Sequence, residues 1–214
     1  MNKFLKGAAI LLGTAAAAEA GGTAYFYRRT MKRYNAKVER TMKMSGVDWE
    51  QYLPLMHQRR KWMMEQPHED VWIQSRDGLK LHATYFKGEE GNRAVICFHG
   101  YTSRGLDDYG SLSWYYLKHG FRMLLLDERA HGDSEGTYIG FGTKDRYDGL
   151  DWTRWMIDKI GEDAQILLHG NSMGGATVCM MSGLQLPEQV KGIVSDCAFT
   201  SAKEVFTHVL HSMY

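Results

Sequence analysis

The sequence predicts an α/β fold in which helices cover both faces of a mostly parallel sheet. From about residue 71 onward, short continuous apolar runs alternate with segments of helical spacing. Strands buried on both faces read as continuous apolar runs, and strands that alternate with helices form parallel sheets. The net charge of +1 and the 12% of aromatic residues are typical of a globular domain. No nucleic-acid partner is expected, because the charge creates no strong field.

Residues 1–27 are predicted to be an N-terminal transmembrane or signal helix. Residues 4–27 read "FLKGAAILLGTAAAAEAGGTAYFY", and a helix of that length spans about 36 Å, enough to cross a bilayer. The first interpretation is a single-pass anchor in the cell membrane. The second is a secretion signal cleaved near Ala20, because "AEA" at 18–20 fits the small-residue pattern. The third is a soluble Ala-rich helix, because Glu19 is charged and alanine is weakly apolar.

The side of the membrane on which the main domain would lie stays open. The basic residues that follow the helix outnumber Lys3 and Lys6 before it, which favours a cytoplasmic domain. An export signal at the start of the chain favours the opposite side.

Residues 28–70 are predicted to be a helical extension that packs on the main domain. The stretch "VDWEQYLPLMHQRRKWMMEQP" at 47–67 carries apolar residues at helical spacing. Pro54 would bend such a helix unless it lies in the first turn.

The elements of the main domain, residues 71–214, follow from local patterns. Two β-rich runs at 71–75 and 79–86 flank "RDG", which is a turn signal, so they predict a hairpin. Beyond it, apolar runs predict buried strands and periodic segments predict helices. In chain order these are a strand at 93–100, a helix at 105–119, a strand at 121–127, a helix at 143–160, a strand at 164–170, a helix at 173–184 and a strand at 190–199.

The three cysteines, Cys97, Cys179 and Cys197, each lie inside an apolar run. An odd number of cysteines in such contexts predicts buried free thiols rather than disulfides. No pair of them has the spacing of a zinc site, so no metal site is expected.

The stretch "HGNSMGG" at 169–175 carries the main chemical signal. Residues 170–174 fit G-x-S-x-G, an apolar strand runs into them, and a helix follows. That order predicts a nucleophile elbow, a tight turn that strains the serine backbone and needs small neighbours. The turn places the serine Oγ at a helix N-terminus, where negative charge is favoured. Ser172 is therefore the candidate nucleophile.

Two further stretches agree with this interpretation. "CFHGYTS" ends the strand at 93–100, and its glycine lets the loop approach the elbow. The backbone N–H groups of Tyr101 and Met173 are then the candidate oxyanion hole. "LLLDERAHGDSEG" places Asp127 and His131 at the carboxyl end of a strand, where open α/β sheets hold their sites.

The chain resembles the α/β-hydrolase superfamily, in particular its serine-aminopeptidase-like and esterase-like branch. The resemblance covers roughly residues 71–205. The matching motifs are "HGYTS" at 99–103, "DERAHGDS" at 127–134 and "GNSMGG" at 170–175. It implies an ester, thioester or amide hydrolase that acts on a small-molecule acyl substrate without a metal or organic cofactor.

The resemblance also implies roles for single residues. Ser172 corresponds to the nucleophile, and the Tyr101 and Met173 amides correspond to the oxyanion hole. His99, Asp127 and His131 occupy positions that are usually structural in such proteins, where they shape the loops.

The partners of Ser172 are not evident, because the family order is serine, then acid, then histidine. The chain ends just after the strand at 190–199. The fold is therefore expected to be incomplete at the C-terminus and the chain to be a fragment. Asp196, then His208 and His211, follow the elbow in the family's order, although both histidines fall on an apparent helix. Asp196 and His208 are the candidate acid and base.

Three functions remain open at this point. The first is a serine hydrolase that works through an acyl-enzyme on Ser172. The second is a non-catalytic, membrane-anchored binding or scaffold protein with an α/β-hydrolase-like fold. The third is an acyltransferase, which uses the same acyl-enzyme with a different acceptor. No oligomeric state is predicted.

Overall fold

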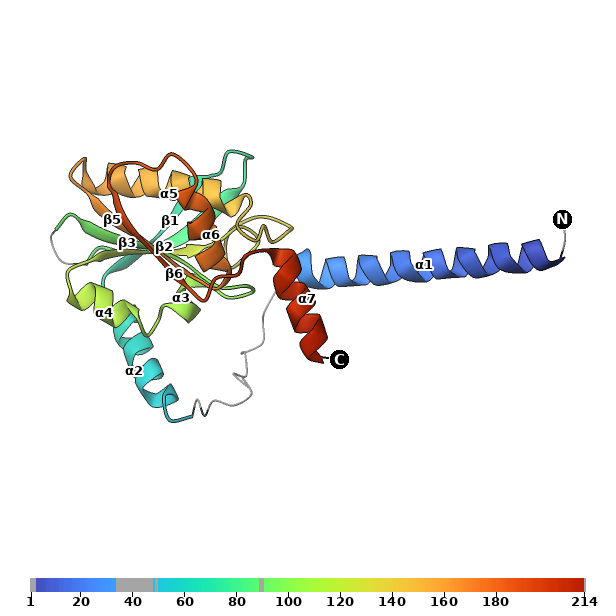
Figure 1. Ribbon diagram of the computed structural model, residues 1–214. Helices are drawn as coiled ribbons and strands as arrows, with labels where there is room; N and C mark the ends of the chain where they lie inside the picture. The colour runs from blue at the N-terminus through green and yellow to red at the C-terminus, as the bar shows by residue number, and fades with distance from the viewer. Residues whose placement is uncertain (1–2, 34–47, 49, 89–90, 214) are drawn as a thin grey trace.

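A six-stranded sheet lies between two layers of helices in the computed structural model, which describes residues 3–33, 48, 50–88 and 91–213 (Figure 1). The strand order is β1-β2-β4-β3-β5-β6. The strands are β1 His68–Gln74, β2 Lys80–Phe86, β3 Arg93–Phe98, β4 Arg122–Asp127, β5 Gln165–Asn171 and β6 Val190–Asp196. Strands β3 to β6 pair in parallel, and β1 and β2 are antiparallel. The predicted α/β class with a mostly parallel sheet is confirmed.

The predicted hairpin is formed by β1 and β2, which pair from Gln74 and Lys80 outward. The Gly78 N–H donates to the Ser75 carbonyl at 2.9 Å, and Gly78 has φ +88°, which glycine adopts without a steric cost. β1 begins at His68, three residues before the expected start of the main domain. The hairpin attaches to the sheet through β2, which runs antiparallel to β4.

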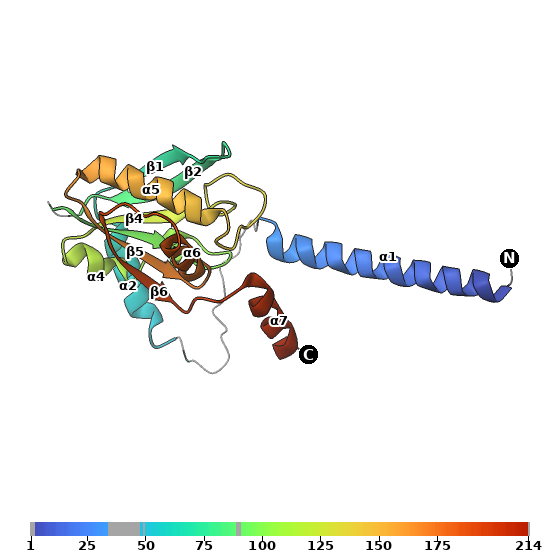
Figure 2. The ribbon, with the colours of Figure 1, turned by 45° about the horizontal axis from the view of Figure 1, so that its top comes forward.

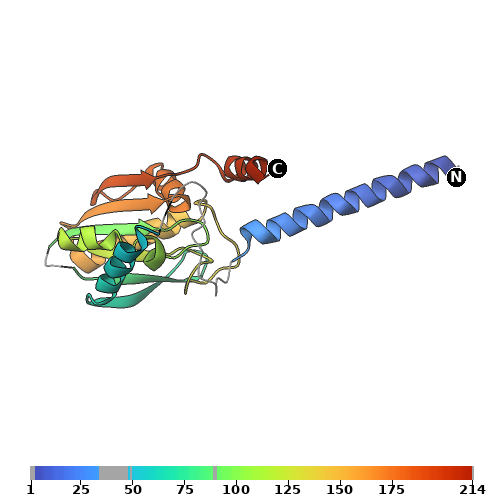
Figure 3. The same cartoon turned by 90° about the horizontal axis from the view of Figure 1, so that it is seen from below.

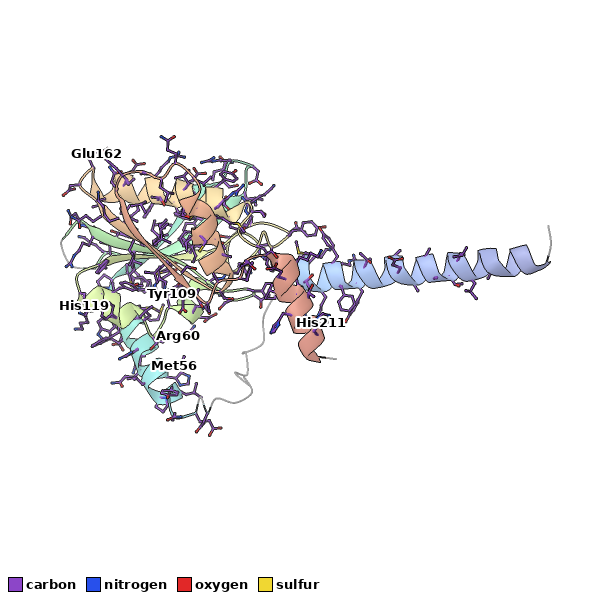
Figure 4. All side chains as sticks on the ribbon, viewed as in Figure 1. Met56, Arg60, Tyr109, His119, Glu162 and His211 are labelled. Atoms are coloured by element: carbon purple, nitrogen blue, oxygen red, sulfur yellow. The ribbon has the colours of Figure 1, made fainter. Side chains whose placement is uncertain are left out.

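Seven helices are described. They are α1 Lys3–Met31, α2 Leu53–Met64, α3 Gly105–Asp108, α4 Ser113–Lys118, α5 Asp145–Ile160, α6 Met173–Ser182 and α7 Ala202–Met213. The single helix expected at 105–119 is wrong, because α3 and α4 are separate short helices. Between them Tyr109 is buried, and its hydroxyl donates to the carbonyls of Phe98 and His169 at 3.1 and 2.9 Å. Tyr109, labelled in Figure 4, thus lies between the two helices and binds the backbone of β3 and β5.

Helices cover both faces of the sheet, as expected. α5 and α6 pack on one face, while α3 and α4 pack on the other with α2 outside them (Figures 1 and 3). Along β3, Ile96 and Phe98 belong to the apolar core beneath α5 and α6, whereas Val95 and Cys97 belong to the opposite core. Alternate side chains of a strand point to opposite faces, so both faces of β3 are apolar.

The helical extension packs on the main domain through α2. Met63 is buried in the core on the α4 side of the sheet. Pro54 lies in the first turn of α2, where its missing N–H removes no helical hydrogen bond. Within the predicted segment 28–70, residues 34–47 and 49 lie outside the described residues.

The N-terminal segment forms one continuous helix, α1, which extends away from the sheet (Figures 1 and 2). In the described parts of the chain, no helix combines the length and the apolarity needed to cross a membrane. The predicted transmembrane anchor is therefore not supported. The helix has the expected length, but alanine and glycine are frequent in α1 and Glu19 adds a charge.

The cysteines are free, as predicted, but only Cys97 is buried. Cys179 on α6 and Cys197 after β6 are exposed, so the prediction of three buried thiols is wrong. The reason is their position beside β6, which in the described residues pairs only with β5 and forms an edge of the sheet. Val194 is exposed at this edge.

Candidate active site

Ser172 lies at the sharp turn between β5 and α6. Its backbone has φ 52° and ψ −107°, an unusual and strained conformation for a residue with a Cβ. The Ser172 N–H donates to the Asp196 carbonyl at 2.8 Å, and the Ala176 N–H donates to the Ser172 carbonyl at 3.0 Å. The predicted strand, turn and helix are therefore present, and the end of β6 braces the turn.

Glycines make the turn possible. A Cβ on Gly170 would lie 2.1 Å from the Gly174 carbonyl oxygen, and a Cβ on Gly174 would lie 2.0 Å from the Phe98 carbonyl oxygen. Both distances are too short for any side chain. A Cβ on Gly100 would lie 3.5 Å from the Ser172 Cβ, so the loop after β3 does approach the elbow.

Tyr101 and Met173 lie on the two segments that meet at Ser172. The Gly174 N–H donates to the His99 carbonyl at 3.0 Å, which ties the start of α6 to the end of β3. Both residues also belong to one apolar group, which we call the rim cluster. It contains Ala130, Ile139, Phe141 and Met173, with Met31, Tyr101, Phe199, Ala202 and Phe206 packed against them. The oxyanion role of the Tyr101 and Met173 amides stays a prediction.

Asp108 is a residue of this site that sequence reasoning missed. Its Oδ2 accepts the Gly100 N–H at 2.6 Å and the Asn171 side-chain amide at 3.2 Å. Its Oδ1 accepts the Ser103 hydroxyl. One carboxylate thus joins the loop after β3 to the residue before Ser172. Its only sequence signal is "LDD" at 106–108, in a segment that reads as an ordinary polar helix.

The two histidines near the elbow hold loops. The His99 Nε2 accepts the Glu128 N–H at 3.0 Å, and the His131 Nε2 accepts the Thr102 N–H at 3.2 Å. Burial, together with the nearby His99, lowers the pKa of His131 to about 3. His131 is therefore neutral at physiological pH with its Nε2 lone pair occupied, so it is unsuited to act as a general base.

Asp127 and His82 form a buried pair beneath the same loop. The His82 Nδ1 lies 2.8 Å from the Asp127 Oδ2, which also accepts the Asp133 N–H at 2.9 Å. Burial opposes both charges, but the hydrogen bond with His82 lowers the pKa of Asp127 to about 2. These three residues bring ligand atoms within 4.8 Å of one another. The hydrogen bonds of Asp127 with His82 and with the Asp133 N–H explain the arrangement, because they anchor the loop after β4 to the sheet.

A second set of buried acids lies behind the elbow. Glu128 and Asp145 are buried, and one oxygen of each has no hydrogen-bond partner within the described chain. Burial raises the pKa of Glu128 well above its usual range and that of Asp145 to about 6. The Glu128 Oε1 accepts the Thr177 hydroxyl from α6 at 3.1 Å. Both acids line a cavity of about 10 Å³, which is far too small for a substrate.

The side chains of the candidate acid and base lie on the surface. Asp196 is exposed at the end of β6, and His208 and His211 are exposed on α7. Figure 4 shows His211 on the part of α7 far from the sheet. Among the residues that the structure describes, no hydrogen bond or ion pair joins Asp196 to His208, or either of them to the Ser172 side chain. Their catalytic roles stay predictions.

Comparison with known proteins agrees with this geometry. The profile of the family described as "alpha/beta hydrolase fold" matches residues 93–213, over half of the chain. The chain is similar to the Pyrococcus furiosus esterase Pf2001, with 26% identity, a TM-score of 0.62, and coverage of 71% of this chain and 60% of the esterase. A second crystal form of that esterase matches at 28% identity and a TM-score of 0.56, over 64% of this chain and 51% of the esterase.

Two curated relatives are each 27% identical. The uncharacterized protein YqkD of Bacillus subtilis matches over 58% of this chain and 40% of its own length. The α/β-hydrolase domain-containing protein WAV2 of Arabidopsis thaliana matches over 63% of this chain and 44% of its own length. The chain thus spans less than half the length of these relatives. With its central parallel strands, its strained serine turn and its family profile, the chain belongs to the α/β-hydrolase fold family.

Proposed function

We propose that this chain carries the nucleophile of a serine hydrolase that cleaves an ester, thioester or amide through an acyl-enzyme on Ser172. The observation that carries the proposal is the strained backbone of Ser172 at the N-terminus of α6. Strain of this kind in a residue with a Cβ persists where the surroundings impose it, and it clusters at functional sites. The similarity to the Pyrococcus furiosus esterase supports the same class of reaction.

The chemistry proposed for the site is acyl transfer in two steps. A general base takes the Ser172 proton as Oγ attacks the carbonyl carbon, and the Tyr101 and Met173 amides stabilise the oxyanion that forms. The tetrahedral intermediate collapses, the bond to the leaving group breaks, and the leaving group takes the proton. Water then attacks the acyl-enzyme in the same way and releases the acid.

The acid and the base of the proposed site have two candidate sources. The lone pairs of His99 and His131 are already used in loop hydrogen bonds. Asp196 and His208 stay the candidates that the sequence predicts within the chain. The alternative is that both groups come from further residues of a longer protein. The partial coverage of the curated relatives, 40% and 44% of their lengths, supports this alternative.

Covalent labelling tests the nucleophile directly. The full-length encoded protein is treated with a fluorophosphonate, which phosphonylates an activated serine, and the modified residue is located by mass spectrometry. We expect labelling at Ser172 and its complete loss in Ser172→Ala. Hydrolysis of p-nitrophenyl esters by the same variant should fall at least about 10³-fold, because a catalytic unit without its nucleophile retains little activity.

The matched control is Ser182→Ala, which removes an exposed hydroxyl at the far end of the same helix. It should label and turn over like the wild type. Equal labelling of Ser172→Ala, or a folded wild type that neither labels nor hydrolyses esters, would overturn the proposal and favour a non-catalytic binding or scaffold protein.

A further inference from the structure

The C-terminal end of α1 changes character where it meets the domain. Residues 10–29 of α1 are almost all exposed, whereas residues 30–33 are half-buried. Figure 2 shows this end of α1 beside the loop between β4 and α5, drawn in yellow. We call residues 30–33 the strap, and residues 128–141 of that loop the rim loop. The strap comprises the last two residues of α1 and the two residues after it, and it is the part of this segment that packs on the domain.

Backbone hydrogen bonds join the strap to the rim loop. Lys32 and Tyr138 form an antiparallel β-bridge. The Ile139 N–H donates to the Met31 carbonyl at 2.7 Å, and the Arg33 N–H donates to the Thr137 carbonyl at 2.8 Å. This pairing sets the register of the strap on the loop independently of side-chain chemistry.

The guanidinium of Arg33 adds a second attachment. Its two terminal nitrogens donate to the carbonyl oxygens of Gly132 and Ser134. Charge-assisted hydrogen bonds of this kind are stronger than neutral ones, and a planar guanidinium fits two carbonyl groups at once. Ser134 is itself fixed, because its hydroxyl donates to the Asp127 carbonyl at 2.5 Å. Arg33 therefore attaches the strap to a rigid part of the rim loop.

The strap also contacts Tyr101, which follows His99 and Gly100 in the loop after β3. The Tyr101 hydroxyl donates to the Thr30 carbonyl at 2.9 Å. The Tyr101 ring stacks on Phe141 with 5.4 Å between ring centroids, and Phe206 of α7 meets it edge-on at 6.4 Å. Met31 packs against the same rim cluster. The side chain of Tyr101 is thus held from the strap, the rim loop and α7.

We propose that the strap is a positioning element for the oxyanion hole, acting through the side chain of Tyr101 and through Arg33. The proposal rests on the proposed function, in which the Tyr101 backbone N–H stabilises the oxyanion. The position of that N–H depends on where the Tyr101 side chain is held, and the strap supplies its hydrogen-bond acceptor. Thr30 and Arg33 touch no reacting atom, so they are positioning residues and not catalytic residues.

Two variants of the full-length protein remove the two attachments. Tyr101→Phe deletes the hydroxyl and keeps the backbone N–H, and Arg33→Met deletes the guanidinium and keeps most of the side-chain volume. We expect each to lower kcat for p-nitrophenyl esters about 10-fold with KM within about twofold, because small misplacements of a stabilising group act on the transition state. Arg33→Lys should recover part of the loss, because an ammonium can still donate to a carbonyl.

The matched control is Arg29→Met, which removes an exposed cation from the preceding turn of α1. It should leave kcat and KM unchanged. All rates are measured well below the unfolding temperature of each variant, so that a loss of folded protein cannot imitate a loss of kcat.

Hydrogen exchange separates this proposal from the proposed function. In Arg33→Met, amides of residues 99–104 and of the rim loop, including Ile139, should exchange faster than in the wild type and in Arg29→Met. If the wild type neither labels nor turns over, the proposed function fails, while faster exchange still supports the coupling of the strap to the Tyr101 loop. Unchanged exchange in both segments, or faster exchange with an unchanged kcat, would overturn the positioning role. A rise in KM alone would also overturn it.

Discussion

At the scale of single residues, Asp145 is a carboxyl group whose environment alters its chemistry. Its side chain is 1% exposed, its Oδ2 accepts the Gly142 N–H at 3.0 Å, and its Oδ1 has no partner within the described chain. Burial raises its pKa to about 6, and the nearby Asp148 adds to the rise. The folded state therefore binds this proton more tightly than the unfolded state, in which the carboxyl has its ordinary pKa of 3.8.

A raised pKa in the folded state stabilises the protein at low pH. The contribution is complete below about pH 4 and is lost as the pH rises through about 6. Asp145→Asn removes this dependence. We expect the free energy of unfolding of the wild type to fall relative to that variant by about 1–3 kcal/mol between pH 4 and pH 7. Urea unfolding at several pH values measures it.

The control for this titration is Asp158→Asn, an exposed acid on the same helix. It is unfolded in urea at the same pH values as Asp145→Asn. The wild type and Asp145→Asn are compared by their free energies of unfolding. If the difference between them is constant from pH 4 to pH 7, Asp145 does not titrate as described.

At the scale of elements, β6 is the strand whose position has the largest consequence. In the described chain it pairs only with β5, and Val194 is 39% exposed on it. An unpaired strand edge is a template for pairing with another chain. A charged side chain on such an edge is one of the ways in which proteins prevent that pairing.

We expect Val194→Lys to reduce self-association of the 214-residue chain, measured by sedimentation velocity over a range of concentrations. The added charge disfavours edge-to-edge pairing of β6 with a strand of a second copy of the chain. The control is Thr207→Lys, which places the same charge on the exposed surface of α7. If both variants associate to the same extent, the edge of β6 is not the contact.

At the scale of the whole molecule, Arg129 links parts of the chain that are far apart in sequence. It donates to Asp148 of α5 from Nε at 2.6 Å and to Asp77 of the β1–β2 turn at 3.0 Å. Arg129 and Asp148 are almost fully buried, whereas Asp77 is more exposed and also pairs with Lys144. The hydrogen bond with Arg129 holds the pKa of Asp77 well below its usual range. The hairpin is thus tied to the layer that covers the sheet.

Removal of one member of a buried pair leaves an uncompensated charge. We expect Arg129→Met to lower the free energy of unfolding by about 3–5 kcal/mol, because Asp148 stays buried without its cation. The double variant Arg129→Met with Asp148→Leu should recover a large part of the loss. Arg154→Met breaks the exposed ion pair with Asp151 and should lower the free energy of unfolding by less than about 1 kcal/mol. Urea unfolding of the wild type and the three variants measures these differences. If Arg129→Met loses no more unfolding free energy than Arg154→Met, the role of Arg129 is contradicted.

The sequence by itself determined the features that depend on neighbouring residues. The apolar runs predicted the strands from β3 to β6, and β3, β4 and β5 are largely buried, which favours continuous apolar residues. The small residues at 170, 174 and 175 predicted the strained turn at Ser172, because the crowding that requires them is local. The length of the N-terminal apolar stretch predicted a membrane span that the structure does not support, because alanine gives length without enough apolarity.

Only the tertiary structure decided the contacts between residues distant in sequence. Asp108 reaches Asn171, and Arg33 reaches the carbonyls of Gly132 and Ser134, because the fold brings those backbone groups together. No local pattern marks such partners, since a polar residue in a helix reads the same whether it faces solvent or a loop. The exposure of the Cys179 thiol and the burial of Asp145 follow from the same cause. Periodicity describes one element, whereas burial depends on which other elements pack against it.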